Sequence, residues 1–196
     1  MGERVPRAFF ARPTLEVARD LLGARLVHRE ADGRRVAGIV VETEAYIGEE
    51  DQGCHARAGR TPRTAVMYGP PGHAYVYFTY GMHWLFNVVT EREGFPAAVL
   101  VRALWPLEGL DLIAARRRGR PRREWTNGPA KLCQALAIDG RYHGADLCAP
   151  DADLFLEFDR TFSDESVTIG PRVGLNTVPE PWKSIPWRFR VHITQP

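Results

Sequence analysis

Two glutamates and a tyrosine alternate within the segment VVETEAY, residues 40–46. Because successive side chains of a strand point to opposite faces, Glu42, Glu44 and Tyr46 would share one face. Val40 precedes them on that face, which indicates that the face enters a partly buried site. A carboxylate beside apolar groups has its ionised form disfavoured, and such a group can act as a general base. The simpler alternative is the solvated face of an amphipathic strand, which would be the commoner outcome for an arbitrary pair of acids.

A second unusual segment, YVYFTYGMHW at residues 75–84, holds five aromatic rings besides a histidine. The pattern predicts two strands joined by a turn, with Tyr80 at the tip. A bulky aromatic side chain at a tip has no core to fill, so it could enter a stack of bases as a wedge. A cross-strand aromatic cluster is the alternative, and we expect it for Phe78 and Trp84.

Arg102 and Asn87 are single polar residues inside otherwise apolar runs. A buried guanidinium needs a partner such as a carboxylate or a phosphate, so Arg102 predicts either a structural or a functional ion pair. A buried amide also needs hydrogen-bond partners. Asn87 could therefore tie the hairpin together or contact the edge of a ligand.

Arginines crowd the segment RRRGRPRR, residues 116–123, although the net charge of the chain is only +2. A dense group of arginines attracts phosphates. A solvated loop is an equally good interpretation, because nearly all basic residues of this chain are arginines. Acidic residues crowd a separate segment, residues 151–165.

The remaining composition limits the class of protein. A chain of 196 residues suffices for one domain with a full core. No stretch approaches the roughly 18 apolar residues of a membrane helix, and the first residues lack the apolar core of a secretory signal. We therefore expect a cytoplasmic protein without a membrane partner. Three widely spaced cysteines without a CxxC pair predict neither a disulfide framework nor a metal site.

The elements that must position these residues follow an α+β pattern. Helical spacing favours helices at residues 14–22, before the arginine segment, and at 127–137. Strand patterns occur at residues 24–28, 35–46, 75–80, 82–89, 97–104, 154–158, 167–170 and 187–193. Residues 49–73 show little periodicity and predict a long surface loop. We predict a single domain over residues 1–196, with a curved, mostly antiparallel sheet, packed helices and a protruding aromatic β-hairpin.

These segments together resemble the alkyladenine (3-methyladenine) DNA glycosylase family. The resemblance runs from Arg12 onward, and the motifs stand in the family's order. They are VETEAY at 41–46, His55 eleven residues after Glu44, YVYFTYGM at 75–82, Asn87, VLVRALWPLEG at 99–109, NGPAKLCQAL at 127–136 and RVG at 172–174.

The resemblance implies a monofunctional glycosylase of base excision repair that flips alkylated or deaminated purines, such as 3-methyladenine and hypoxanthine, out of duplex DNA. Glu44 would activate the attacking water, and Arg102 would help to hold that water. The implied pocket for the flipped base consists of Tyr46, His55, Tyr77 and Asn87. Asn87 would also exclude a 2-amino group from the pocket.

The resemblance further implies that Tyr80 fills the gap in the duplex and that Arg60, Arg63 and Lys131 contact the DNA backbone. The expected partner is damaged double-stranded DNA, bound by a monomer without a cofactor or a metal ion. The residues agree with this chemistry, because aromatic faces attract a positively charged alkylated purine. The chain has only two lysines, neither of them in the carboxylate or hairpin motifs, so a Schiff-base step is not expected.

Two other functions fit part of the pattern. A non-catalytic nucleic-acid binder would use the same sheet and basic loop, but it leaves Glu44 and Arg102 unexplained. A glycoside hydrolase could use Glu42 and Glu44 as its two carboxylates, about 7 Å apart on one strand face. That function gives no purpose to Tyr80 or to the arginine segment.

Overall fold

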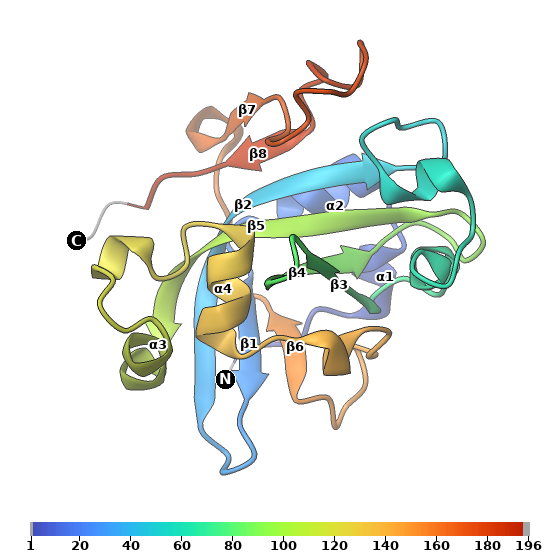
Figure 1. Ribbon diagram of the computed structural model, residues 1–196. Helices are drawn as coiled ribbons and strands as arrows, with labels where there is room; N and C mark the ends of the chain where they lie inside the picture. The colour runs from blue at the N-terminus through green and yellow to red at the C-terminus, as the bar shows by residue number, and fades with distance from the viewer. Residues whose placement is uncertain (1, 194–196) are drawn as a thin grey trace.

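Two long antiparallel strands, β2 (Arg35–Ile47) and β5 (Ala97–Glu108), form the middle of the sheet in the computed structural model, which describes residues 2–193. Their pairing shifts register beside Gly38 and on both sides of Glu42. Irregularities of this kind bend a strand and strengthen its twist. Both strands bend visibly near the middle (Figure 1). The bend directs the second half of β2, which carries Glu42 and Glu44, away from the turn between β1 and β2.

The other strands extend this pair on both sides. They are β1 (Arg25–Arg29), β3 (Ala74–Thr79), β4 (His83–Val89), β6 (Leu154–Glu157), β7 (Thr168–Gly170) and β8 (Arg188–Arg190). The main path runs β3-β4-β5-β2-β1-β6, and all pairings in the described residues are antiparallel. The first half of β2 pairs with β1, and a short stretch of its second half pairs with β8, which in turn carries β7.

Within residues 2–193, four α-helices pack around this sheet. They are α1 (Arg7–Phe10), α2 (Thr14–Asp20), α3 (Leu110–Arg116) and α4 (Pro129–Leu136). Helix α2 lies behind β2 and β5 in Figure 1, whereas α4 crosses in front of β5 and packs on β4. Both helices present fully buried apolar residues to the sheet, such as Val17 and Leu132. Their burial supplies the main hydrophobic core.

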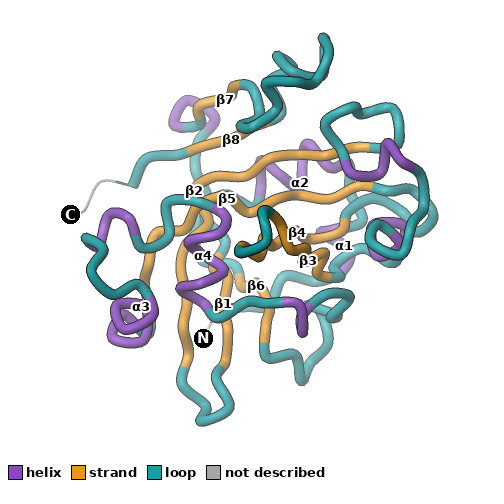
Figure 2. The backbone as a smooth tube through the Cα atoms, viewed as in Figure 1, coloured by secondary structure: helices purple, strands orange, loops and turns teal. Residues whose placement is uncertain are grey.

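Residues 49–73 are more ordered than the predicted surface loop. Two 3-10 helices, η1 (His55–Ala58) and η2 (Ala65–Tyr68), interrupt the loop segments, as Figure 2 shows by colour. Three further 3-10 helices are η3 (Arg122–Glu124), η4 (Gly140–Tyr142) and η5 (Asp164–Ser166). Cys54 and Met67 are almost fully buried in a second apolar cluster beneath residues 49–73. The sequence did not predict this order, because short 3-10 helices produce no helical periodicity of apolar residues.

The aromatic hairpin predicted from the sequence is formed by β3 and β4. Thr79 pairs with His83, and the N–H of Met82 donates to the carbonyl of Thr79 to close the turn. Tyr80 and Gly81 both have positive φ angles, 52° and 68°. Tyr80 is 87% exposed, so the ring stands free of the core. Left-handed backbone costs a side-chain-bearing residue roughly 1–2 kcal/mol, which shows that the tip is not optimised for stability.

The α+β prediction is confirmed by this arrangement of one open, antiparallel sheet with helices on its faces. Within residues 2–193, none of the helices has the length and apolar character needed to cross a bilayer.

Candidate active site

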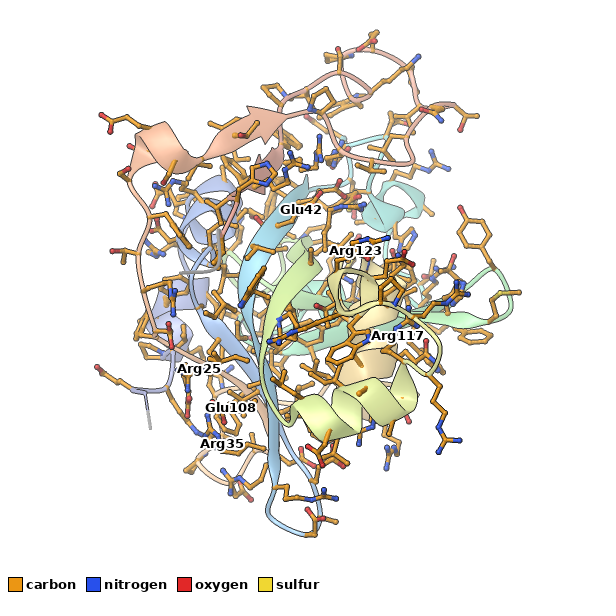
Figure 3. All side chains as sticks on the ribbon, turned by 90° about the vertical axis from the view of Figure 1, so that its left-hand side faces the viewer. Arg25, Arg35, Glu42, Glu108, Arg117 and Arg123 are labelled. Atoms are coloured by element: carbon orange, nitrogen blue, oxygen red, sulfur yellow. The ribbon has the colours of Figure 1, made fainter. Side chains whose placement is uncertain are left out.

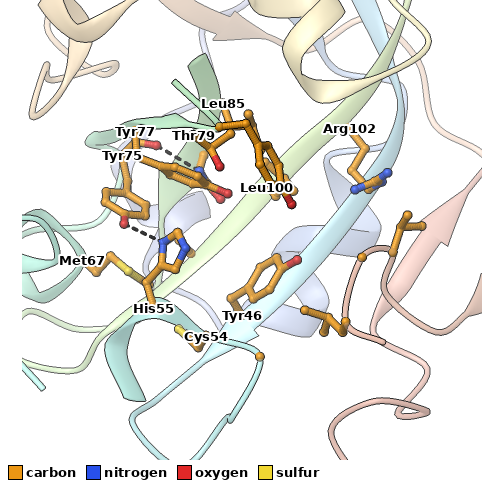
Figure 4. Close-up of a pocket in the computed structure, with 17 residues that line it drawn as sticks. Tyr46, Cys54, His55, Met67, Tyr75, Tyr77, Thr79, Leu85, Leu100 and Arg102 are labelled. Carbon is orange, nitrogen blue, oxygen red and sulfur yellow. Dashed lines mark hydrogen bonds between the residues drawn. The ribbon is translucent and has the colours of Figure 1, made fainter. Parts of the chain in front are cut away.

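A cavity of about 270 Å³ opens between the hairpin, the end of β2 and the loop after β7. Figure 4 shows its aromatic wall on one side and Arg102 on the other. The cavity is lined by Tyr46, Gly53, Cys54, His55, Met67, Tyr75, Tyr77, Thr79, Tyr80, Leu85, Asn87, Ala98, Leu100, Arg102, Val173, Gly174 and Leu175. Rings and a few polar groups thus surround a space suited to a flat, polar-edged ligand.

Glu44 lies on β2 directly behind this wall, with its side chain completely buried. Its Oε2 accepts hydrogen bonds from the Tyr46 hydroxyl at 2.8 Å and from Arg102 Nη1 at 3.3 Å. Its Oε1 accepts the backbone N–H of Val173 at 2.6 Å. All three donors line the cavity, whereas Glu44 itself does not. Tyr46, Arg102 and Val173 therefore lie between the cavity and the carboxylate of Glu44.

Burial raises the pKa of the Glu44 carboxyl above its ordinary value, although Arg102, the Val173 N–H and the Tyr46 hydroxyl each oppose that rise. The Tyr46 hydroxyl keeps its proton because burial, followed by the adjacent Glu44 charge, raises the pKa of Tyr46 well above its usual value. A desolvated carboxylate whose ionised form is stabilised by hydrogen-bond donors has the properties of a general base.

Arg102 on β5 joins the two glutamates predicted to share a strand face. Its Nε donates to Glu42 at 3.1 Å while Nη1 reaches Glu44. Glu42 also accepts from Arg188 of β8 at 3.1 Å. Glu42 is thus held in two ion pairs, and it does not line the cavity. This argues against the two-carboxylate glycoside hydrolase considered from the sequence.

The aromatic wall is built from His55 of η1, Tyr75 and Tyr77 of β3, and Tyr46 of β2. His55 Nδ1 lies 2.9 Å from the Tyr75 hydroxyl, and the His55 ring packs edge-on against Tyr77 with centroids 4.6 Å apart. Burial, followed by the charges of Arg63 and Arg57, lowers the pKa of His55 to about 4. The imidazole is therefore uncharged at neutral pH and does not repel a cationic ligand.

Asn87 of β4 is 3% exposed and lines the cavity floor beside the wall. Its Nδ2 donates to the Tyr75 carbonyl at 3.0 Å across the hairpin. This bond ties β3 to β4 and also fixes the amide toward the cavity. The structural alternative considered for Asn87 from the sequence is confirmed, whereas contact with the edge of a ligand stays a prediction.

Comparison with known proteins places this chain in a family. The family model described as methylpurine-DNA glycosylase matches residues 8–195. The chain belongs to this methylpurine-DNA glycosylase family. The family consists of DNA glycosylases, so the protein is an enzyme of that class and acts in DNA repair. The resemblance noted from the sequence motifs is thereby confirmed.

Individual relatives are similar over nearly their whole lengths. A protein of Methanocella arvoryzae is 48% identical over 94% of this chain and 90% of its own. One of Carboxydothermus hydrogenoformans is 48% identical over 94% and 93%, and one of Myxococcus xanthus is 48% identical over 97% and 91%. Each of these relatives is named provisionally as a 3-methyladenine DNA glycosylase.

The residues expected to contact DNA come from three parts of the fold: the hairpin, residues 49–73 and α4. Tyr80 lines the mouth from the hairpin tip. Arg60 and Arg63 are exposed and lie over the Tyr68 and Tyr77 rings, at 5.8 and 5.1 Å from the ring centroids. The cavity therefore has cationic groups next to its aromatic wall.

Lys131 and the arginine segment belong to the other flank. Lys131 projects from α4, where its Nζ donates to the Asn127 side chain at 2.8 Å. Thr126 follows the arginine segment by three residues and forms two hydrogen bonds with the backbone of Leu104, which lies two residues beyond Arg102 on β5. The Thr126 hydroxyl donates to the Leu104 carbonyl, and the Thr126 carbonyl accepts the Leu104 N–H. The segment is thus anchored beside the site, and its later arginines are exposed.

Sequence reasoning missed a charged pair that packs behind the cavity. Asp51 and Arg172 have completely buried side chains joined by hydrogen bonds of 2.5 and 2.7 Å. Asp51 follows two other acids in a loop, and Arg172 stands in a polar tail, so neither position carries a signal of burial. In the sequence, Arg172 stood out only as the first residue of the RVG motif at 172–174.

The polar groups of the site are those of acid–base chemistry. In the part of the chain that the structure describes, no three His, Cys, Asp or Glu side chains converge as metal ligands would.

Proposed function

We propose that this glycosylase flips alkylated and deaminated purines, with 3-methyladenine and hypoxanthine as representatives, out of duplex DNA and hydrolyses their N-glycosidic bond. The observation that carries the proposal is a buried carboxylate, Glu44, held by three donors at the back of an aromatic cavity. The enzyme acts as a single chain, without a Schiff-base intermediate.

Glu44 acts as the general base. A water at the cavity wall between Arg102 and Val173 lies next to the carboxylate and faces the sugar of the flipped nucleotide. Glu44 takes one proton from this water as the oxygen bonds to C1′ of the sugar. The C1′–N bond breaks, and its electron pair leaves with the base. A cationic alkylated purine leaves as a neutral base, so one base and one water suffice for its hydrolysis. Hypoxanthine leaves as an anion and takes up a proton from the solvent, while the proton taken from the attacking water stays on Glu44 until it is released.

The aromatic wall selects the base. Stacking on Tyr46, His55 and Tyr77 stabilises a flipped purine by about 1–3 kcal/mol per ring. A positive charge on an alkylated base adds roughly 0.5–2 kcal/mol through attraction to the ring faces. The uncharged state of His55 supports this role, because a protonated imidazole would repel the same base.

Duplex DNA is engaged around the cavity mouth. Tyr80 enters the space that the flipped nucleotide leaves, which offsets part of the few kcal/mol that unstacking costs. Arg60, Arg63 and Lys131 bind flanking phosphates. The exposure and strained backbone of Tyr80 support this assignment, since the ring contributes nothing to the core.

The test is release of hypoxanthine and 3-methyladenine from defined duplexes by the wild-type protein and by Glu44→Gln. We expect the variant to lose about 10²-fold or more in the single-turnover excision rate, while lesion binding changes by no more than several-fold. Glu49→Gln is the matched control, because Glu49 also accepts a tyrosine hydroxyl, from Tyr68, but lies outside the cavity. Near-normal excision by Glu44→Gln would remove Glu44 from the mechanism and direct attention to Glu42.

A further inference from the structure

The loop after β7 reaches the active site at Val173, whereas Trp187, which packs against the main core, lies at the other end of this loop. Between residues 171 and 188, Arg172 is the only buried residue, whereas its neighbour Val173 is 47% exposed. Yet Val173 is the residue whose N–H donates to Glu44 at 2.6 Å. The position of this donor therefore depends on what holds Arg172.

Arg172 is held by a bidentate ion pair. Its Nη1 and Nη2 donate to the two carboxylate oxygens of Asp51, and both side chains are inaccessible to solvent. The same two nitrogens also donate to the carbonyls of Ala45, at 3.0 Å, and Trp182, at 3.2 Å. The guanidinium thus connects β2 next to the catalytic carboxylate with two points of the C-terminal loop.

Asp51 fixes the other side of the pair. Its carboxylate accepts the backbone N–H groups of Gly53 and Ile47, at 2.9 and 3.3 Å. These bonds shape the turn between the end of β2 and the wall residue His55. The approach is close, since a Cβ on Gly53 would lie 2.8 Å from Arg172 Nη2.

Stability alone is a poor reason for such a pair. Two buried charges lose much of their hydration, and a well-packed apolar pair is often at least as stable. What the ion pair provides is direction, because a planar guanidinium with several donors fixes orientation in a way that apolar contacts do not.

We propose, building on the assignment of Glu44 as the base, that Asp51 and Arg172 are positioning residues that place the Val173 N–H against the Glu44 carboxylate. The pair acts as a clamp on three backbone segments: the end of β2, the turn before His55 and the loop that carries Val173. Neither residue contacts the substrate or the attacking water.

The clamp has a consequence for the ionisation of Glu44. The Val173 N–H is one of the groups that lower the pKa of Glu44 against the effect of burial. The charged and titratable groups facing Glu44 are Glu42 and Tyr46 on β2, Tyr77 on β3, Arg102 on β5 and Arg188 on β8. None of these groups is removed when the clamp is broken. Arg172 itself lies over the Tyr46 ring at 4.6 Å, but the double variant removes both opposite charges of the pair, so a change in its pH profile reports on Val173.

The experiment measures single-turnover excision of hypoxanthine across pH for Asp51→Asn and for the double variant Asp51→Asn/Arg172→Gln. The double variant leaves no unpaired buried charge, which protects the fold. We expect the maximal rate to fall about 10- to 100-fold through misplacement of the base. The acidic limb should move to higher pH, with DNA affinity within several-fold of wild type.

Asp146→Asn is the control, because it breaks another arginine–aspartate pair, with Arg7 at 2.6 Å, away from the cavity. It should leave the acidic limb unchanged even if the melting temperature falls. Folded clamp variants with a wild-type acidic limb would overturn the positioning role, and so would unfolding of both variants, which would make the pair a folding element. Neither result touches the assignment of Glu44, which fails only if Glu44→Gln still excises.

Discussion

At the scale of single residues, Tyr46 has two tasks in the proposed site. Its ring forms part of the cavity wall, and its hydroxyl donates to Glu44. The protonated hydroxyl stabilises the ionised carboxylate without contributing charge. The ring and the hydroxyl can be separated by a substitution that removes only the oxygen.

Tyr46→Phe is expected to keep base stacking and to raise the pKa of Glu44, because the carboxylate loses a hydrogen bond that lowers it. Since the base must be ionised, excision should then decline at a higher pH than in the wild type as the solution is acidified. Single-turnover rates across pH provide the measurement. Tyr68→Phe is the control, as Tyr68 donates to Glu49 outside the cavity, and an equal shift in both variants would contradict the assignment.

Asn87 is the residue expected to reject guanine-type bases. Asn87→Ser should widen the spectrum toward purines with a 2-amino group, because the shorter side chain removes a steric conflict and a facing donor. The bond to Tyr75 would be lost as well, so stability should fall by about 0.5–1.5 kcal/mol.

The measurement is excision of hypoxanthine and of a methylated guanine by the same preparation, alongside its melting temperature. Relative activity on the guanine lesion should rise. A uniform loss on both lesions with a lower melting temperature would leave Asn87 only its structural role in the hairpin.

At the scale of elements, the β3–β4 hairpin exposes the ring of Tyr80 on a left-handed backbone that lowers the stability of the fold. Asn adopts the left-handed conformation of position 80 more readily than Tyr. Tyr80→Asn is therefore expected to stabilise the fold by up to about 1 kcal/mol and to lower excision. Tyr80→Ala should lower excision to a similar extent without that gain in stability.

The loss should be largest for lesions that remain well paired, since the duplex then competes better with the flipped state. Comparing hypoxanthine opposite cytosine with hypoxanthine opposite an abasic site measures this difference. Ile169→Ala is the control, because Ile169 is an exposed hydrophobic residue away from the cavity. Equal losses on both duplexes would rule out a wedge.

How far the sequence predicts these elements depends on the range of the interactions involved. Strand alternation placed Glu42, Glu44 and Tyr46 on one face, and the contacts of Arg102 with both glutamates confirm this. The hairpin followed from its turn glycine and its aromatic spacing. These patterns are local, so they can be recognised in a single chain.

What the sequence did not show depends on residues far apart in the chain. Asp51 and Arg172 are separated by 121 positions, and only the folded sheet brings them together. The 3-10 helices within residues 49–73 were not predicted either, because packing stabilises them and their sequence shows no helical periodicity. One of the donors to Glu44 is the backbone N–H of Val173, and the position of a backbone group cannot be predicted from the residue type.

At the scale of the whole molecule, charge is distributed unevenly. At the N-terminal end of β2 the arginines are neutralised by carboxylates, and Arg25 and Arg35 both form ion pairs with Glu108. Figure 3 labels these residues well away from Arg117 and Arg123. Near the cavity, the exposed Arg60 and Arg63 have no carboxylate partner among residues 2–193. The same holds for Arg118, Arg120, Arg122 and Arg123 of the arginine segment.

Unpaired surface arginines favour binding of a polyanion through release of its counterions. If Arg60, Arg63 and Lys131 each contact one phosphate, substitution of each by Gln should reduce the slope of log Kd against log salt concentration by about one. The paired variant Arg122→Gln/Arg123→Gln applies the same measurement to the arginine segment. Affinity should fall alike for lesion-bearing and undamaged duplexes, because phosphate contacts carry no base information.

Arg34→Gln is the matched control for this series. Arg34 is an exposed arginine in the β1–β2 turn, it pairs with Asp32 at 2.8 Å, and the turn lies at the end of the molecule opposite β8 in Figure 1. Its loss should leave the salt dependence unchanged, because a paired arginine far from the cavity mouth releases no counterions from bound DNA. An unchanged slope in the Arg60 and Arg63 variants would place the duplex on another face. An unchanged slope in the Arg122/Arg123 variant alone would make the arginine segment a solvated loop and confine the DNA footprint to the hairpin side of the cavity.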